Sequence, residues 1–437
     1  MRLARVFAIV LLIASGLSIR GSSVRADNWP TWRGPTGNSV SHDTDLPLEW
    51  SEGGNNVRKT SLPEWGTSTP AIWKDAVFLT TESDGKLLLL KIDKQTGETQ
   101  WTRQVGTGTA NRKPAGGENR AAKFHDMHNL ASPSPVTDGE RVIVHFGNGD
   151  LASYTFDGKL EWTINLAEKF GKYTIWWGHA NSPILYDDLV ISACMQDSMA
   201  GQWEKLSPSY IVAHDKRDGR LVWNTPRMTG GDAEQCDAYT TPVLHRSQER
   251  TELVVMGGNQ LDAYDPADGR QLWSLGGLVG GRTITGPTVA HGLVFATVGM
   301  RGPLHAVKLG GNGLRKADEA VAWKETHNTP DTSCPVVSGD LLFMVSDNGI
   351  ASCFDAKDGS EKWRKRIGGE NHKASPLAAD GRIYFLSRNG ICTVIRAAAE
   401  FELLAENRLD DEFMASPAIS DGKIYLRGRK SLYTISK

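Results

Sequence analysis

Among the pairs in which a small residue precedes proline, eight recur at intervals of 41 to 65 residues along this chain of 437 residues, and this repeat constrains the fold more than any other feature. The eight pairs are Thr69-Pro70, Ser134-Pro135, Ser182-Pro183, Thr241-Pro242, Gly286-Pro287, Cys334-Pro335, Ser375-Pro376 and Ser416-Pro417. Because proline cannot donate a hydrogen bond to a sheet, it survives at a strand start or at a sheet edge. Self-similarity of this kind indicates a repeat architecture.

A second mark, Gly-x-x-x-Trp, recurs in phase with the first. It occurs at Gly97/Trp101, Gly158/Trp162, Gly219/Trp223, Gly269/Trp273 and Gly359/Trp363. Trp323 fits the same phase without the glycine, and the site near Leu404 has lost its tryptophan. We interpret these tryptophans as structural rings on the outermost strand of each repeat, where a large ring covers the seam to the next repeat.

The unit from Cys334 to Arg366 shows the repeat most clearly. It contains four short segments that we interpret as strands, separated by turns at Ser338-Gly339, Asn348-Gly349 and Asp358-Gly359. Asn-Gly and Asp-Gly are strong hairpin signals, because both residues tolerate a positive φ. Four strands in about 40 residues form one propeller blade. The sequence therefore predicts an all-β fold, an eight-bladed β-propeller of four-stranded antiparallel blades.

The two ends of the chain are predicted to close the ring together. Only three strands fit after Pro417, so the eighth blade lacks its outer strand. We expect an N-terminal strand at Leu46–Trp50 to pair beside Ser431–Ile435 and supply it.

Residues 1–26 are predicted to be a signal peptide, followed by a single propeller domain over residues 27–437. Two arginines precede a short apolar run, and Val24-Arg25-Ala26 has the small-x-small form of a cleavage site. A retained membrane anchor is the alternative, although the apolar run is short for a bilayer span. We expect an exported protein, either free in the periplasm or outside the cell or peripheral to the outer membrane. No lipid-attachment cysteine lies near position 27, and no other transmembrane segment is expected.

The net charge argues against nucleic-acid binding, and the cysteine count argues against complete disulfide pairing. The whole chain carries a net charge of −2, and removing the first 26 residues removes four arginines and leaves −6. No basic field is available to hold nucleic acid. The five cysteines are scattered and odd in number, so at least one thiol is expected to stay unpaired.

The Asp-Gly-x-x-x-Trp repeat with a following Ser-Pro resembles the propeller repeats of pyrroloquinoline quinone (PQQ) dehydrogenases and of BamB-type proteins of outer-membrane assembly. The segment Asn28–Pro35, NWPTWRGP, is similar to the opening of bacterial PQQ-binding-like propellers. The resemblance implies an exported, non-catalytic binding or scaffolding propeller. The alternatives are a PQQ- and calcium-dependent quinoprotein oxidoreductase and a glycan-binding module.

Departures from the dehydrogenase pattern favour the non-catalytic interpretation. PQQ dehydrogenases resemble this chain in repeat but carry two neighbouring cysteines beside the quinone, and no two cysteines adjoin here. No insert carries a recognisable calcium-binding set. No hydrolase signature such as Gly-x-Ser-x-Gly or His-Glu-x-x-His is present. No resident cofactor or metal is therefore predicted.

The residues just before the repeat prolines should enter the central channel from one mouth. We predict a ligand site there, formed by His125, His128, Trp177, His179, Asp237, Tyr239, His327 and His372. Trp176 and Trp177 could stack a sugar or another flat ring. His125 and His128 with His179 or Asp237 offer metal donors, although His-x-x-His on a loop is a weak signal. The remaining alternative is a polar mouth without a ligand. A protein partner, a small ligand or a glycan is expected at this mouth.

Overall fold

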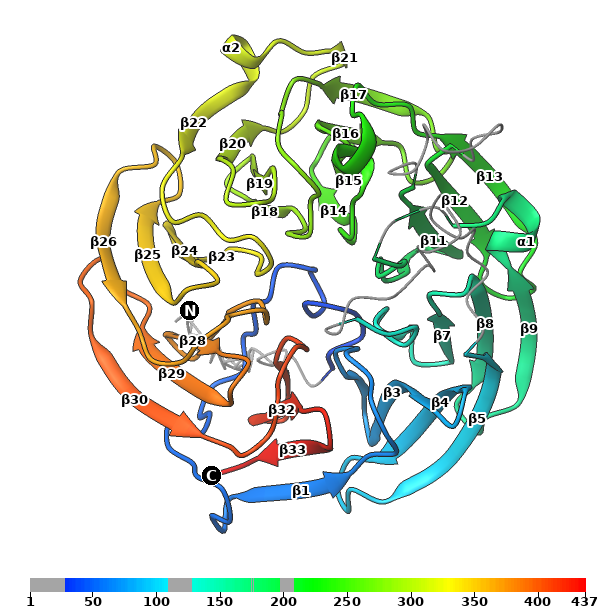
Figure 1. The fold of residues 1–437 in the computed structure, drawn as a ribbon, viewed down its shortest axis with the longest axis vertical. Coiled ribbons are helices and arrows are strands. Elements are labelled where there is room, and N and C mark those ends of the chain that lie inside the picture. The colour runs from blue at the N-terminus through cyan, green and yellow to red at the C-terminus, as the bar shows by residue number, and fades with distance from the viewer. Residues whose placement is uncertain (1–27, 109–127, 174, 176, 197–207) are drawn as a thin grey trace, which may run out of the picture.

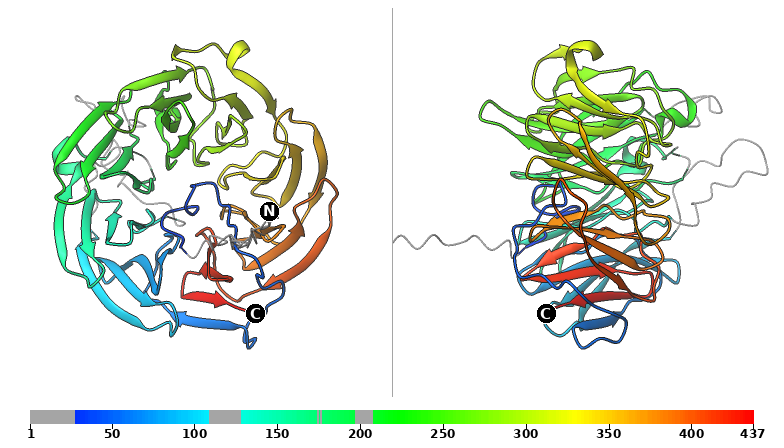
Figure 2. Two further views of the ribbon diagram at one scale, coloured as in Figure 1. Left: turned by 180° about the vertical axis from the view of Figure 1, so that it is seen from behind. Right: turned by 90° about the vertical axis from the view of Figure 1, so that its left-hand side faces the viewer.

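The chain forms a ring of eight antiparallel sheets around a central channel, a β-propeller (Figure 1). The structure, a computed structural model, describes residues 28–108, 128–173, 175, 177–196 and 208–437. The predicted signal peptide lies outside these residues. Seen from the side, the ring is a thick disc (Figure 2). The fold class predicted from the repeat is confirmed.

Seven blades follow one another along the chain, each running from its innermost to its outermost strand. Blade 1 contains β2 (Ala71–Trp73), β3 (Ala76–Ser83), β4 (Lys86–Asp93) and β5 (Thr99–Thr107). Blade 2 contains β6 (Val136–Thr137), β7 (Arg141–His145), β8 (Asp150–Thr155) and β9 (Leu160–Asn165). Blade 3 contains β10 (Ile184–Tyr186), β11 (Leu189–Cys194), β12 (Tyr210–Asp215) and β13 (Leu221–Pro226). Blade 4 contains β14 (Val243–Arg246), β15 (Thr251–Gly257), β16 (Gln260–Tyr264) and β17 (Gln271–Leu275), with the short strand β21 (Gly313–Leu314) added in parallel.

Blades 5 to 8 complete the ring. Blade 5 contains β18 (Thr288–Ala290), β19 (Leu293–Thr297), β20 (Leu304–Lys308) and β22 (Val321–Glu325). Blade 6 contains β23 (Val336–Ser338), β24 (Leu341–Val345), β25 (Ile350–Asp355) and β26 (Glu361–Arg366). Blade 7 contains β27 (Leu377–Ala379), β28 (Arg382–Leu386), β29 (Ile391–Arg396) and β30 (Leu403–Arg408). Blade 8 contains β31 (Ala418–Ser420), β32 (Lys423–Arg427), β33 (Ser431–Ile435) and β1 (Val57–Ser61).

Helix is almost absent from the described residues. The connections hold α1 (Leu166–Phe170), α2 (Ala317–Ala320) and the 3₁₀ turn η2 (Ala233–Cys236). None of these helices is long and apolar enough to span a membrane.

Every repeat proline directly precedes the innermost strand of a blade, as predicted from its missing N–H. The residue before the proline does more than fit a narrow space. The backbone N–H of Thr69 donates to Ser134 Oγ at 2.9 Å, and Ser134 N–H donates to Ser182 Oγ at the same distance. The link continues from Ser182 to Thr241 at 2.9 Å, and later from Gly286 through Cys334, Ser375 and Ser416 at 3.0–3.1 Å. These side chains therefore join neighbouring inner strands around the channel.

The repeat tryptophans lie on the outermost strands, and five of them bond to the next blade, whereas Trp273 donates to Glu252 of its own blade at 3.3 Å. Trp162 Nε1 donates to the backbone oxygen of Lys216 at 2.9 Å, and Trp363 Nε1 donates to that of Ala398 at 3.1 Å. Trp101, Trp223 and Trp323 make equivalent bonds at 3.1–3.2 Å. The structural interpretation of these rings is thus supported by their contacts.

The closing strand is not the predicted one. Val57–Ser61 pairs with Ser431–Ile435, so the eighth blade is composite as expected, but Leu46–Trp50 lies elsewhere. Trp50 packs on blade 7. Its backbone N–H donates to Asn407 Oδ1 at 2.8 Å, and its ring stacks on Tyr384. The prediction of Leu46–Trp50 as the outer strand of blade 8 is therefore wrong. The sequence pattern aligns Trp50 with the repeat tryptophans and therefore assigns it to blade 8, which lacks an outer strand. In the structure Trp50 lies on blade 7, whose own outer strand lacks a tryptophan.

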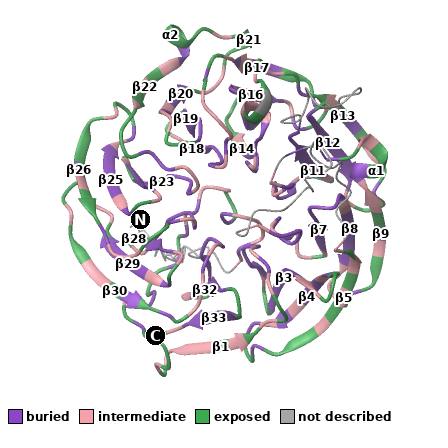
Figure 3. Cartoon of the chain, viewed as in Figure 1, coloured by how far each residue is buried: buried purple, intermediate pink, exposed green. Residues whose placement is uncertain are grey.

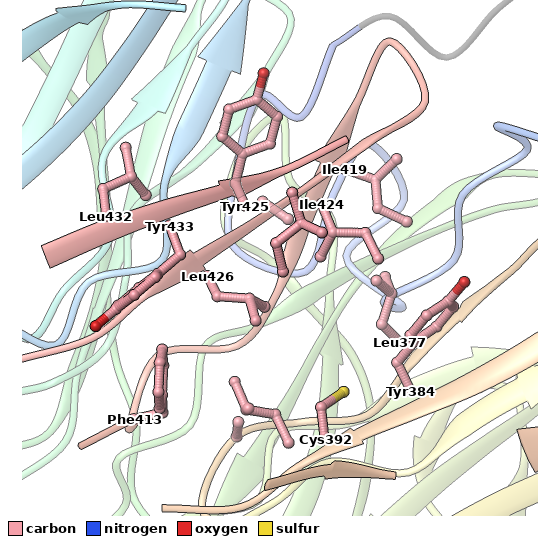
Figure 4. Packing of buried hydrophobic residues seen from close by; sticks show 14 of the residues in the cluster. Leu377, Tyr384, Cys392, Phe413, Ile419, Ile424, Tyr425, Leu426, Leu432 and Tyr433 are labelled. Atoms are coloured by element: carbon pink, nitrogen blue, oxygen red, sulfur yellow. The ribbon is translucent and has the colours of Figure 1, made fainter. Parts of the chain in front are cut away.

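Burial follows the radius of the ring. The middle strands are almost fully buried, and the outer strands alternate exposed with covered residues (Figure 3). The largest apolar cluster lies where blades 7, 8 and 1 meet the N-terminal residues Trp29, Leu46 and Trp50. Figure 4 shows part of this cluster, with Leu377 beside Tyr384 in blade 7 and Ile424 in the neighbouring blade 8. The N-terminal segment thus belongs to the core.

Candidate functional site

The N-terminal segment crosses the central channel and narrows it at one end (Figure 1). Trp29 exchanges two backbone hydrogen bonds of 2.8 Å with Ile72 of blade 1. Asn38 accepts the N–H of Val289 in blade 5, and Ser39 accepts that of Ala378 in blade 7. The segment therefore satisfies inner-strand groups that would otherwise be open edges.

Arg33 anchors this segment. Its guanidinium is fully buried and donates to the backbone oxygens of Pro287 at 2.9 Å and Pro335 at 3.1 Å. It also donates to Thr288 Oγ1 at 2.5 Å and to Ser39 Oγ at 3.1 Å. Burial lowers the pKa of Arg33 from its ordinary value. A single side chain thus links the segment to blades 5 and 6.

The opposite mouth opens into a cavity of about 320 Å³, which we call the mouth cavity. Trp32 lines it, and also lines a second cavity formed by residues 30–38 and the far ends of the inner strands. The indole of Trp32 is therefore the boundary between the two. Trp32 also fills the space beside Gly286, where an added Cβ would lie 3.2 Å from its ring.

Three of the predicted site residues line the mouth cavity: His128, Trp177 and Tyr239. The hydroxyl of Tyr239 accepts the backbone N–H of Trp177 at 3.2 Å and donates to Asp237 at 3.3 Å. Asp237 is fully buried behind Tyr239. Burial, aided by the Asp237 charge, raises the pKa of Tyr239, so this phenol is a neutral donor near pH 7.

His128 belongs to a hydrogen-bonded loop. Its Nδ1 lies 2.8 Å from Ser132 Oγ, and that hydroxyl also contacts the backbone oxygen of Asn129 at 2.8 Å and Thr67 Oγ1 at 2.8 Å. Ser132 Oγ further accepts the N–H of Asn129 at 3.3 Å. These contacts make Ser132 a loop-closing hydroxyl, since its donor and acceptor positions are engaged.

His179 lies behind the cavity wall in a buried chain of polar groups. Its Nε2 is 3.2 Å from His145 Nδ1, and His145 Nε2 is 3.1 Å from Tyr173 Oη. Tyr173 Oη in turn lies 3.6 Å from Cys194 Sγ. Burial lowers the pKa of His179 to about 3 and holds that of His145 well below its usual range. Both rings are therefore neutral at physiological pH.

The remaining predicted residues lie away from the cavity or outside the described residues. His327 is exposed at the rim, where its backbone N–H donates to Glu325 Oε1 at 2.6 Å. His372 is buried behind the wall, and burial lowers its pKa to about 4. His125 and Trp176 fall outside the described residues. His128, Trp177 and Tyr239 thus lie together at the mouth as predicted, whereas His327 lies outside the cavity at the rim.

Charged residues at the rim of the cavity are paired across blades. Arg282 lies 3.2 Å from Asp331 and 3.4 Å from Glu234, and Lys373 pairs with Asp347. Asp347 also accepts the backbone N–H of Asp331 at 3.2 Å. This chain of alternating charges joins the mouth loops of blades 4 to 7.

A metal site needs several donor side chains within reach of one ion. Within residues 28–108, 128–173, 175, 177–196 and 208–437, no three His, Cys, Asp or Glu side chains gather where one metal ion could bind them. Cys194, Cys334, Cys353 and Cys392 are free and buried, and burial raises the pKa of Cys194 to about 11. The described residues therefore offer neither an adjoining cysteine pair nor such a metal-ligand cluster.

Sequence reasoning missed the hydroxyl groups of the cavity. Thr69, Ser134, Ser182, Thr241, Ser375 and Ser416 all line it. The signal was present in the residue before each repeat proline, but it indicated only small size. The ring-forming bonds of these residues come from the neighbouring blade, far away in sequence.

Comparison with known proteins agrees with the geometry. The model of the family described as outer membrane protein assembly factor BamB matches residues 39–198, 207–307 and 312–400. No curated protein matches the chain.

Solved structures with the same fold include both functional classes that the repeat suggests. Quinohemoprotein alcohol dehydrogenase from Comamonas testosteroni is 13% identical, with 96% of this chain and 82% of that chain covered and a TM-score of 0.69. A europium-containing methanol dehydrogenase is 10% identical, with 93% and 90% covered and a TM-score of 0.65. BamB from Moraxella catarrhalis is 12% identical, with 86% and 99% covered and a TM-score of 0.55. At these identities the likeness shows the fold alone, and the family match establishes that the chain belongs to the PQQ-repeat β-propellers described as outer membrane protein assembly factor BamB.

Proposed function

We propose that this protein is an exported, non-catalytic binding propeller that uses its mouth face to hold a partner or ligand, in the manner suggested by the BamB family description. The observation that carries the proposal is the mouth cavity. Trp32 separates it from the second cavity, and Arg33 anchors the segment that carries Trp32. The mouth cavity is a concave surface bordered by loops on a rigid scaffold, which is the usual arrangement of a binding site.

The side chains around the cavity support binding over catalysis. Ser132 is occupied by loop contacts, and burial, aided by the Asp237 charge, keeps the phenol of Tyr239 neutral. The cations Arg282 and Lys373 are paired with carboxylates. Export itself is part of the proposal, because it rests on the signal peptide predicted for residues 1–26.

Site-specific photocrosslinking tests the proposal. A photoreactive amino acid at Ile284, which lines the mouth cavity, should crosslink a partner in cells that export the protein. The matched control is Thr36, an exposed residue of the N-terminal segment beyond Trp32. Crosslinks from Ile284 but not from Thr36 would support the mouth as the binding face.

The same preparation tests the oxidoreductase alternative. Absorption and mass spectrometry of protein purified from its native compartment should show no quinone. A bound quinone together with dye-linked alcohol oxidation would reject the non-catalytic role.

A further inference from the structure

Six hydroxyl groups form a belt around the mouth cavity: Thr69, Ser134, Ser182, Thr241, Ser375 and Ser416. Each residue is at most 5% exposed. Within the described part of the chain, five of the six oxygens accept a backbone N–H from the preceding blade, at 2.9–3.0 Å. We call this set the hydroxyl belt.

The chemistry of the hydroxyl belt is one-sided. A serine or threonine hydroxyl has one O–H donor and two acceptor lone pairs. A backbone N–H already occupies one acceptor position on five of these hydroxyls, whereas no protein acceptor for the six O–H groups is found among the described residues. The belt therefore offers buried donors to the lumen, and a ligand rich in oxygen acceptors would satisfy them.

The rim indicates that this ligand is neutral. Arg282 and Lys373, the cations that line the cavity, are paired with Asp331 and Asp347, and Glu234 contacts Arg282 as well. An added anion would have to compete with these carboxylates. Acceptor-rich chemistry without charge is the chemistry of a polyhydroxylated compound.

Aromatic rings supply the apolar part of the site. Trp32 lies at the boundary with the second cavity, and Trp177 and Tyr239 line the wall. The C–H face of a pyranose packs on such rings, while its oxygens reach hydroxyl donors. A volume of about 320 Å³ lies at the lower end of the range for ligand pockets, about 300–1,000 Å³, and suits one or two sugar rings.

We propose that the mouth cavity binds a neutral sugar residue, either as a free saccharide or as the end of a glycan chain. This inference rests on the proposed function and names the ligand of its site. Sugar oxygens accept from the hydroxyl belt, and the ring lies against the aromatic wall formed by Trp177 and Tyr239.

Paired variants test the hydroxyl belt without removing the contacts that hold the ring. Ser182→Cys keeps an acceptor for the N–H of Ser134 but replaces the O–H with a weak S–H donor. The chain itself uses cysteine in this role, since Cys334 Sγ accepts the N–H of Gly286 at 3.1 Å. Thr69→Val removes the hydroxyl of a belt residue for which the structure records no accepted N–H. The control is Thr393→Val in β29 of blade 7. The hydroxyl of Thr393 is buried and has no hydrogen-bond partner among the described residues.

Binding is measured on the full mature protein by saturation-transfer NMR and by tryptophan fluorescence. The probes are glucose, galactose, mannose, N-acetylglucosamine, glucuronate and linear oligosaccharides of the neutral sugars. At least one neutral sugar should bind, and more tightly than glucuronate. Ser182→Cys and Thr69→Val should each weaken binding by about 3- to 10-fold, whereas Thr393→Val leaves it unchanged. Trp177→Leu should weaken binding at least as much.

The outcomes separate this inference from the proposed function. Tighter binding of oligosaccharides would identify a glycan end, and equal binding would identify a free saccharide. Absence of binding by every neutral sugar, or binding that the belt variants leave unchanged, would overturn the inference. A protein crosslinked from Ile284 in that case would leave the proposed function standing, whereas a bound quinone would remove it.

Discussion

Trp50 stacks on Tyr384 with ring centroids 6.4 Å apart and planes inclined by 20°. This contact repairs a gap in the repeat, because β30 carries Ala405 at the register where β26 carries Trp363. The N-terminal segment therefore donates to blade 7 the ring that its own outer strand lacks.

We expect Trp50→Ala to lower the free energy of unfolding by about 3–5 kcal/mol, because the change leaves a cavity at a buried seam. Urea unfolding of the mature protein measures it. Trp65→Ala is the comparison, since this half-buried ring packs under Arg429 and should cost less. Equal costs for the two variants would contradict the role assigned to Trp50.

Arg58 takes the place of the tryptophan in blade 8. Its guanidinium donates to the backbone oxygens of Gln95 and Lys94, the latter at 2.8 Å, and lies against Gly97. Arg58→Ala should destabilise the fold by about 1–3 kcal/mol because it leaves these seam carbonyls without their donor. Lys86→Ala, at an exposed site on β4, should change stability by less than about 0.5 kcal/mol in the same unfolding measurement. A cost for Arg58→Ala as small as that of Lys86→Ala would show that the arginine does not fasten the seam.

Acid should destabilise the protein through the His145–His179 pair. The folded pKa of His179 is about 3 and that of His145 is also far below the unfolded value of about 6.5, because both rings are buried. Above pH 6.5 both histidines are neutral in the folded and in the unfolded chain, so their protonation does not change the free energy of unfolding. As the pH falls below 6.5 the unfolded chain binds protons that the folded chain cannot, and stability declines by up to about 1.4 kcal/mol per pH unit for each histidine.

Urea unfolding between pH 7.5 and 4.5 checks this slope. His145→Gln/His179→Gln should reduce this slope without abolishing it, because burial also lowers the pKa of His372 to about 4. His327→Gln, which changes an exposed ring, should leave the slope as in the parent protein. An unchanged slope in the double variant would assign acid sensitivity to other groups.

The series of side chains that link neighbouring inner strands is interrupted at Gly286, which has no side chain. Trp32 occupies the space beside it. Gly286→Ser should cost about 1–3 kcal/mol, since the new Cβ would lie 3.2 Å from the indole and 3.3 Å from the Thr241 backbone oxygen. In a Trp32→Ala background the cost should shrink, giving a coupling energy of about 0.5–3 kcal/mol in a double-mutant cycle. Strictly additive effects would show that the two positions do not compete for space.

The features of the propeller repeat that depend on local chemistry were predicted from the sequence. Each repeat proline begins an inner strand because its missing N–H has the same consequence in every blade. Asn348-Gly349 likewise forms a turn between the expected strands, because Gly349 adopts a positive φ of 82°. The number of blades follows from counting these marks.

Features that depend on contacts between distant blades could not be predicted. β1 has no tryptophan, so nothing in its five residues marks it as the closing strand, and the partner of Trp50 lies at the other end of the chain. His327 has the expected phase, but Glu325 holds its backbone at the rim. The hydroxyl before each proline was interpreted by its size, because its hydrogen-bond partner belongs to the next blade.

The pairing of Val57–Ser61 with Ser431–Ile435 also sets an order of events during synthesis. Hairpins within blades 1 to 7 can form as the chain emerges, since their strands are close in sequence. The clasp in blade 8 must wait for the last residues and for a loop of nearly the whole chain to close, which is entropically slow. Until then the faces of blades 1 and 7 that border the gap expose apolar surface, so a stalled or truncated chain remains an open arc prone to aggregation.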